Sequence, residues 1–272
     1  MKFGMKCRFN DVQEMLKFNP QVLEFHFSDK DLDVQIPDTK YEQELMVHAP
    51  EYLDYKLVDL GSIGETNQIL SREQSVEVIR RTIKKTMEMT KNFKGKPSIV
   101  IHPGGYSMNP ASKEEVKQMN DNLKKSVMEL KNADVDLYLE NLPPFPWFFG
   151  GQYICNVFLD AQEIKEFCDE TGIKITFDTS HSMLYCNHAG KNIADEIKII
   201  QPYIAHLHIA DGEGVDGEGL QIAEGDIDWD VIMPLLKENP DITFVPEIWK
   251  GHEKNGQGFK IAMERLEKYL KN

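Results

Sequence analysis

Arginine is scarce in this chain: the 45 acidic residues outnumber the 31 lysines and arginines, and only five of those 31 are arginine. Proteins that bind nucleic acids need basic surface that neutralises phosphates. The acidic balance therefore argues against DNA or RNA as a partner, and against an anionic membrane surface. No run of about 18 apolar residues occurs either, so we expect no membrane-spanning helix.

Cysteine is also sparse, with four residues in the chain. They form no CxxC pair, and their spacing suggests neither a zinc knuckle nor a disulfide scaffold. The opening residues Met1 to Lys6 lack the apolar core of a signal peptide. These absences predict a reduced, cytoplasmic location. Nothing in the sequence indicates an oligomeric state.

What the sequence does contain is an alternation of short apolar runs with helical patterns. Strands are expected near 2–7, 22–27, 45–48, 98–102, 136–140, 173–178, 204–208 and 243–247. Helices are expected near 11–18, 73–93, 112–132, 161–171, 190–200, 228–238 and 257–270. Such alternation predicts a parallel sheet with right-handed crossovers. The 272 residues suit one eight-stranded parallel (β/α)8 TIM barrel, which typically takes roughly 250 residues. We therefore predict a single α/β domain over 1–272, with an open sheet as the alternative.

Local signals support some of these boundaries, but the segment after the second expected strand has little sign of a helix. Ser71 with Gln74 and Ser112 with Glu115 fit capping boxes at helix starts. Gly172 fits a helix stop. In contrast, residues 30–44 show little periodicity, so any helix there is short, and 49–70 reads as an extended loop.

Polar residues that could bind a metal end six of the expected strands. They are His48, His102, Glu140, Asp178, His208 and Glu247. The second strand adds Glu24 and His26. The last inward side chains of barrel strands face one opening, where barrel enzymes keep their chemistry. One such histidine would more often be an ordinary hydrogen-bonded group, but buried carboxylates gathered there need a partner. The set therefore predicts a divalent metal ion bound between carboxylates and histidines.

The order of these motifs along the chain is similar to that in a known protein family. The chain has Leu139-Glu140-Asn141, Asp178-Thr179-Ser180-His181, His206-Leu207-His208-Ile209-Ala210-Asp211, and Pro246-Glu247. In this it resembles the xylose isomerase-like TIM-barrel superfamily over nearly its whole length. That group contains sugar isomerases and epimerases, and also endonuclease IV. The resemblance implies a metal held by Glu140, Asp178, His208 and Glu247, and a substrate contact from His181.

The epimerase branch implies a metal-dependent isomerase or epimerase acting on a sugar, sugar phosphate or polyol through an enediolate. Glu140 and Glu247 would be its catalytic acid and base, with His181 as a further proton carrier. The residues expected to contact substrate are Arg8, His26, Trp147 and Asp211. Arg8 is the only arginine expected at the rim, since the epimerase arginine after the His-x-x-Asp motif is missing. Trp229 and Trp249 are expected to be packing residues.

Endonuclease IV is the alternative that the resemblance implies: a metal-dependent phosphodiesterase on abasic DNA. Its upstream histidine ligands fall on His48 and His102, which would hold a second metal ion. The stretch from Asp216 to Gly225 contains no histidine for a third ion. A third hypothesis is a barrel that binds a ligand without turnover. Oxygen-rich ligation suits manganese or magnesium, whereas ligation by His48 and His102 shifts the expectation to zinc, cobalt or iron.

Overall fold

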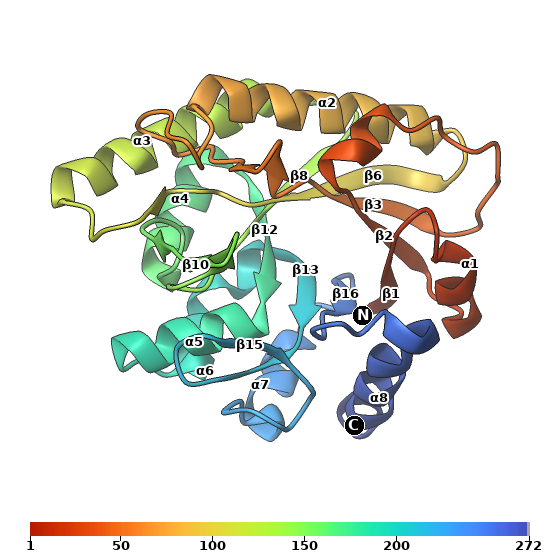
Figure 1. Ribbon diagram of the computed structural model, residues 1–272. Coiled ribbons are helices and arrows are strands. Elements are labelled where there is room, and N and C mark those ends of the chain that lie inside the picture. Colours follow the sequence, from red (N-terminus) through yellow and green to blue (C-terminus); the bar gives the residue numbers. More distant parts are fainter. Residues whose placement is uncertain (271–272) are drawn as a thin grey trace.

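The computed structural model, which describes residues 1–270, contains a closed barrel of eight parallel strands (Figure 1). Around the barrel these are β1 (Lys2–Cys7), β16 (Thr243–Pro246), β13 (Ile204–Ile209), β12 (Lys174–Asp178), β8 (Asp136–Glu140), β6 (Lys94–Ile101), β3 (Glu44–His48) and β2 (Val22–His26). The pairing of β1 with both β2 and β16 closes the ring. The predicted TIM barrel is confirmed, and the open sheet is excluded. The predicted boundary at residue 272 lies outside the described residues.

Helices lie outside the ring of strands (Figure 1). They are α1 (Val12–Met15), α2 (Arg72–Thr90), α3 (Lys113–Leu130), α4 (Ala161–Thr171), α5 (Thr179–Ala189), α6 (Ile193–Ile200), α7 (Trp229–Leu236) and α8 (Glu253–Leu270). The capping boxes at Ser71 and Ser112 are confirmed. Gly172 ends α4 in the left-handed region, at φ 67°. Helix α5 was not expected from the sequence. None of the helices within 1–270 is long and apolar enough to cross a membrane.

The strands bury both of their faces. One face supplies the main core between barrel and helices, with Leu23, Phe25, Val47 and Ile99 among its buried side chains. The opposite face points into the barrel. There a small apolar cluster of Val22, Met46 and Val100, packed against Tyr138, fills one layer. Toward the carboxyl ends of the strands this inner face becomes polar and brings the strand-end residues together.

Loops after the barrel strands build the walls around this opening. The weak second unit contains only a 3₁₀ helix, Asp29–Asp33, as expected from its poor periodicity. The loop after β3 holds a hairpin of β4 (Tyr52–Leu53) and β5 (Lys56–Leu57). Further short pairs are β7 (Tyr106–Ser107) with β11 (Ile154–Cys155), β9 (Trp147–Phe148) with β10 (Gly151–Gln152), and β14 (Asp211–Glu213) with β15 (Gly217–Leu220).

Candidate metal centre

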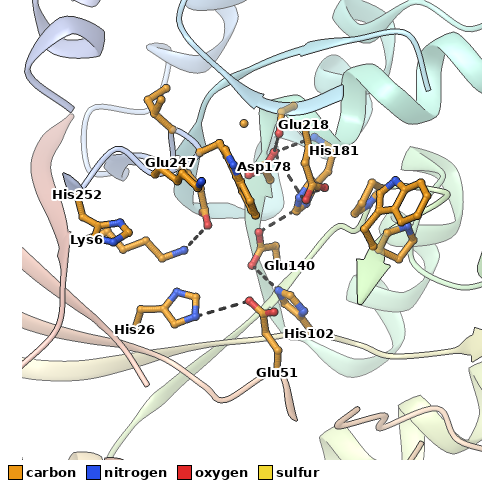
Figure 2. A pocket seen from close by; sticks show the side chains of 18 of the residues that line it. Lys6, His26, Glu51, His102, Glu140, Asp178, His181, Glu218, Glu247 and His252 are labelled. Atoms are coloured by element: carbon orange, nitrogen blue, oxygen red, sulfur yellow. Dashed lines mark hydrogen bonds and ion pairs between the residues drawn. The ribbon is translucent and has the colours of Figure 1, made fainter. Parts of the chain in front are cut away.

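A pocket of about 500 Å³ opens at the carboxyl-terminal rim of the barrel. Glu140, Asp178, His181 and Glu247 line it, so four of the predicted site residues face one cavity (Figure 2). Rims of this kind carry the active sites of TIM-barrel enzymes. The pocket is therefore the candidate active site.

The four residues expected to bind the metal meet at this rim. Glu140, Asp178, His208 and Glu247 each offer one ligand atom, and these atoms all lie within 4.8 Å of one another. They come from β8, from β12, from β13 and from the residue after β16. The backbone N–H of Glu247 donates to the carbonyl of Ile209 at 3.0 Å, which fixes the last member beside β13.

His208 directs one ring nitrogen at Glu24 and the other at the carboxylates of the pocket. Its Nε2 lies 3.1 Å from Glu24 Oε1, and Glu24 Oε2 lies 2.8 Å from His206 Nε2. An ionised carboxylate only accepts hydrogen bonds, so both Nε2 atoms carry protons. His208 Nδ1 lies 3.0 Å from Glu140 Oε1 and 2.5 Å from Glu247 Oε2, so Nδ1 is the ring nitrogen that a cation bound among these carboxylates would meet. A carboxylate behind a histidine is the usual support of a metal ligand.

The carboxylates that meet here favour a positive charge among them. Burial opposes a charged imidazole, yet the carboxylates of Glu247, Glu24 and Glu140 raise the pKa of His208 well above its ordinary value. Burial, with the negative charges of Glu247 and Glu140, raises the pKa of Asp178. The buried Oδ2 of Asp178 has no hydrogen-bond partner within the described part of the chain. These residues fit a divalent cation, which would satisfy Asp178 and neutralise the carboxylates.

The two carboxylate oxygens of Asp178 have different roles: Oδ1 caps a helix, and Oδ2 faces the site. Its Oδ1 accepts from the backbone N–H of His181 at 2.8 Å and from Ser180 Oγ at 2.7 Å, so it caps the start of α5. This cap also positions His181 at the rim. Its Nδ1–H donates to the carbonyl of Asn141 at 2.9 Å, which turns Nε2 toward Glu218, 3.6 Å away.

A second cluster adjoins the first through Glu140. Glu140 Oε2 lies 3.2 Å from His48 Nε2 and 3.3 Å from His102 Nε2, while Oε1 faces His208. Burial opposes ionisation, but His208, His102 and His48 hold the pKa of Glu140 well below its ordinary value. The three donors of His48, His102 and Glu140 lie within 4.8 Å of one another. The structure therefore brings the two predicted second-metal histidines beside the first group.

The residues expected to contact substrate divide into two groups. Arg8, His26 and Trp147 line the pocket. Asp211 does not, and a substrate contact from it is not supported: its buried carboxylate accepts hydrogen bonds from Trp229 Nε1 at 2.8 Å and from the backbone of Ala223 and Ile227. Asp211 instead holds together the segment that leads into α7.

Several residues at the site were not assigned from the sequence. The Lys6 ammonium is paired with Glu247 and lies 3.8 Å from Glu24 Oε1 (Figure 2). Glu51 lines the pocket from the loop after β3, and Glu218 lines it from β15. Trp249, expected to be a packing residue, lines the pocket and is 70% exposed, which corrects that prediction. Buried Trp229 is confirmed as a packing residue.

Comparison with known protein families gives an extensive match. The model of the family described as "Xylose isomerase-like TIM barrel" matches residues 39–269. The uncharacterized protein MJ1311 of Methanocaldococcus jannaschii is 29% identical over 202 residues, covering 73% of this chain and 62% of that protein. This chain thus corresponds to less than two thirds of the relative's length.

Solved structures extend the likeness to the three-dimensional fold. A D-tagatose 3-epimerase-like protein superposes with a TM-score of 0.72 and 24% identity, over 100% of this chain and 97% of that one. Endonuclease IV from Thermus thermophilus has a TM-score of 0.64 and 15% identity, over 98% of this chain and 100% of that one. At these identities the likeness shows a shared fold, and the fold alone does not choose an activity.

Proposed function

The chain belongs to the xylose isomerase-like TIM barrel family, and from this premise we propose that it is a metal-dependent isomerase or epimerase of a sugar, sugar phosphate or polyol. The observation that carries the proposal is the convergence of Glu140, Asp178, His208 and Glu247 within 4.8 Å. These four residues would hold the divalent cation. When bound, the cation would polarise a substrate carbonyl as a Lewis acid.

Glu140 and Glu247 are the two members of this group that are suited to proton transfer. Both line the pocket, and the side chain of Glu247 is 30% exposed, so a substrate can reach it. One glutamate would remove the proton from the carbon next to the carbonyl, giving an enediolate. The other, or His181 through Nε2, would return the proton. Return to the opposite face of the same carbon is epimerisation, and return to the neighbouring carbon is aldose–ketose isomerisation.

Other pocket residues would bind the rest of the substrate. Arg8 and His26 offer hydrogen-bond donors to hydroxyl or phosphate oxygens. Trp147, 55% exposed on the β9–β10 hairpin, offers a ring face to a sugar. The volume of about 500 Å³ leaves room for a carbohydrate of moderate size.

Turnover with isotope labelling tests the proposal. Protein loaded with manganese, magnesium, cobalt or zinc is incubated in deuterium oxide with a panel of sugars, sugar phosphates and polyols. We expect chromatographic conversion of at least one compound, with deuterium at the carbon next to the carbonyl. Unchanged compounds across the panel, from protein shown to be folded and cation-loaded, would contradict the proposal.

Endonuclease IV-like cleavage of abasic DNA remains the second candidate, because His48 and His102 add a second cluster on Glu140. The net charge of −14 argues against a DNA substrate. A duplex with a single abasic site separates the two: strand cleavage by the loaded protein would favour the phosphodiesterase. A folded protein that binds sugars but converts none would favour a ligand-binding barrel.

A further inference from the structure

Two hairpins, on the loops after β3 and β8, meet through aromatic side chains. Tyr52 and Tyr55 belong to the β4–β5 hairpin, and Phe149 lies at the tip of the β9–β10 hairpin. The ring centroid of Phe149 lies 5.6 Å from that of Tyr52 and 6.2 Å from that of Tyr55. Tyr52 is 37% exposed, Tyr55 79% and Phe149 39%. We call these three residues the aromatic platform.

The backbone at both hairpin tips has a conformation that bulky residues rarely adopt. Tyr55 has φ +63° and Phe149 has φ +51°, each in the two-residue turn of its hairpin. Such turns favour glycine, asparagine and aspartate at these positions, so an aromatic residue there strains the backbone. Strained residues gather at ligand clamps and active sites. The two tips therefore point to a ligand that contacts their rings.

The platform adjoins the pocket. Trp147 and Phe148 line the pocket and belong to the same hairpin as Phe149. The ring centroids of Phe148 and Phe149 are 6.5 Å apart. A row of rings thus leads from the wall of the pocket to the exposed platform, so one ligand can contact both.

Size and charge indicate what this ligand is. Aromatic faces pack well against the C–H faces of sugar rings. The pocket of about 500 Å³ is large for one hexose of about twelve non-hydrogen atoms, since pockets of this size usually enclose drug-sized ligands. Lys56, the only basic residue of the two hairpins, is paired with Glu65 at 2.5 Å, so the hairpins offer no free cation to a phosphate. The platform therefore suits an uncharged sugar.

We propose that the substrate is an uncharged saccharide of at least two linked sugars, whose second ring binds on the aromatic platform. The inference rests on the proposed function, because the carbonyl end of the first sugar would lie among the proposed cation ligands. Those ligands include the buried Glu140, at the inner end of the pocket. The other end of an open-chain sugar then points to the opening, and a second sugar linked there would reach the rings of the hairpins.

Saturation-transfer NMR tests the inference without turnover. Zinc-loaded protein is titrated with glucose and with maltose, cellobiose and lactose, three disaccharides that share glucose as the reducing unit. We expect at least one disaccharide to bind about 10-fold more tightly than glucose, with saturation on both of its rings. Equal affinity for glucose and all three disaccharides would overturn the inference.

Tyr55→Gly separates ligand binding from packing. Glycine adopts the left-handed backbone without strain, so the variant should unfold at the same or a higher urea concentration than wild type. Its affinity for the disaccharide should fall by about 3-fold to 10-fold, while its affinity for glucose stays unchanged. Phe149→Asn, which also tolerates this backbone, should act in the same direction. Lower stability with an unchanged ratio of the two affinities would show that the rings only join the hairpins, against the inference.

The control is Met128→Ala, which removes another exposed apolar side chain, from the outer helix α3. Both affinities should stay as in wild type. A fall in disaccharide affinity equal to that of Tyr55→Gly would mean that the effect is not specific to the platform, and would count against the inference.

Two other occupants of the platform give different results. Duplex DNA with an abasic site that binds wild type but not Tyr55→Gly would assign the rings to nucleic-acid bases. A wild-type dimer that dissociates in Phe149→Asn would assign them to a second copy of the chain. Either result would overturn the inference.

The outcome is separable from that of the proposed function. A disaccharide that binds through the platform but is not converted keeps the binding site and counts against the isomerase or epimerase. Conversion of a monosaccharide, with no tighter binding of any disaccharide, supports the reaction and removes the site for a second sugar.

Discussion

At the scale of single residues, Glu247 is the most direct test of the proposed chemistry. Burial would disfavour its charge, but His208 and Lys6 hold its pKa well below the ordinary value, so it is an ionised base that reaches the pocket. Glu247→Gln keeps the size and removes the base. We expect the turnover rate to fall by about 10²-fold to 10⁴-fold, measured as kcat on a converted sugar. Full activity would remove Glu247 from the catalytic pair.

Asp211 provides the opposite kind of residue, one that supports the fold. Asp211→Ala leaves the buried Trp229 Nε1 and three backbone N–H groups without their acceptor. Each unsatisfied buried group costs about 1–3 kcal/mol, so urea unfolding should show a loss of about 3 kcal/mol or more. The zinc content of the folded variant should equal that of wild type. Normal stability combined with a raised KM would restore the substrate contact predicted from sequence.

The meeting of Glu140, Asp178, His208 and Glu247 could be predicted because each ends an expected strand, where parallel strands of a barrel converge, and the family resemblance singled out these four among six such residues. Lys6 and His206 could not be placed the same way, and Glu24 was noted only as a polar residue of the second strand. They lie within strands whose two faces are both buried, so the sequence does not tell which face meets the helices and which meets the barrel interior. Register decides it: Lys6 is the partner of Glu24, which places both charges inside. Glu51 was missed because it lies on a loop.

At the scale of elements, α5 is the helix that hydrophobic periodicity did not predict. Its buried side chains include Thr179, Ser180 and Ser182, so the apolar stripe that announces a helix is missing. Its N-cap is Asp178, which the sequence presents as the end of a strand. The other helices were predicted because their buried faces are apolar at helical spacing.

The loops after β3 and β6 depend on a tight contact between Gly104 and Asp59. Asp59 accepts from the backbone N–H groups of Gly61, Gly105 and Tyr106. Gly104 has φ +82°, and a Cβ there would lie 2.2 Å from Asp59 Oδ1. Gly104→Ala should therefore destabilise the protein by about 2 kcal/mol or more, measured by urea unfolding.

The matched control for this substitution is Gly64→Ala, because nothing lies within 4 Å of a Cβ built at Gly64. It should leave the free energy of unfolding within about 0.5 kcal/mol of wild type. Equal stability of the two variants would show that the loops tolerate a side chain at Gly104.

At the scale of the whole molecule, cation removal should be felt as lost thermal stability. A ligand at 100 times its Kd stabilises the folded state by about 2.7 kcal/mol. For a barrel of this size that corresponds to a Tm change of roughly 5–10 °C. We expect a decrease of that order after chelation, measured by circular dichroism, and recovery on adding zinc.

Asp178→Asn is the control for this experiment. It keeps an oxygen for the cap of α5 and replaces the cation-facing oxygen by an amide, so chelation should change its Tm much less. An unchanged Tm of the wild type after verified metal removal would show that the folded barrel gains nothing from a cation.

Closure of the barrel was predictable because eight apolar strand patterns follow each other with helical crossovers between most of them. The polar interior was only partly predictable. It depends on contacts between residues as distant in sequence as His206 and Glu24, which only the closed ring creates.

The same interior links the two ends of the barrel. The hydroxyl of Thr243, the first residue of β16, lies 2.6 Å from His206 Nδ1, and through His206 and Glu24 this contact leads to His208. The orientation of His208, a proposed metal ligand, is thus set partly from the amino-terminal end of the barrel strands, opposite the pocket. Thr243→Val removes this hydroxyl. It should lower the affinity for the proposed cation while leaving every group in the pocket chemically intact.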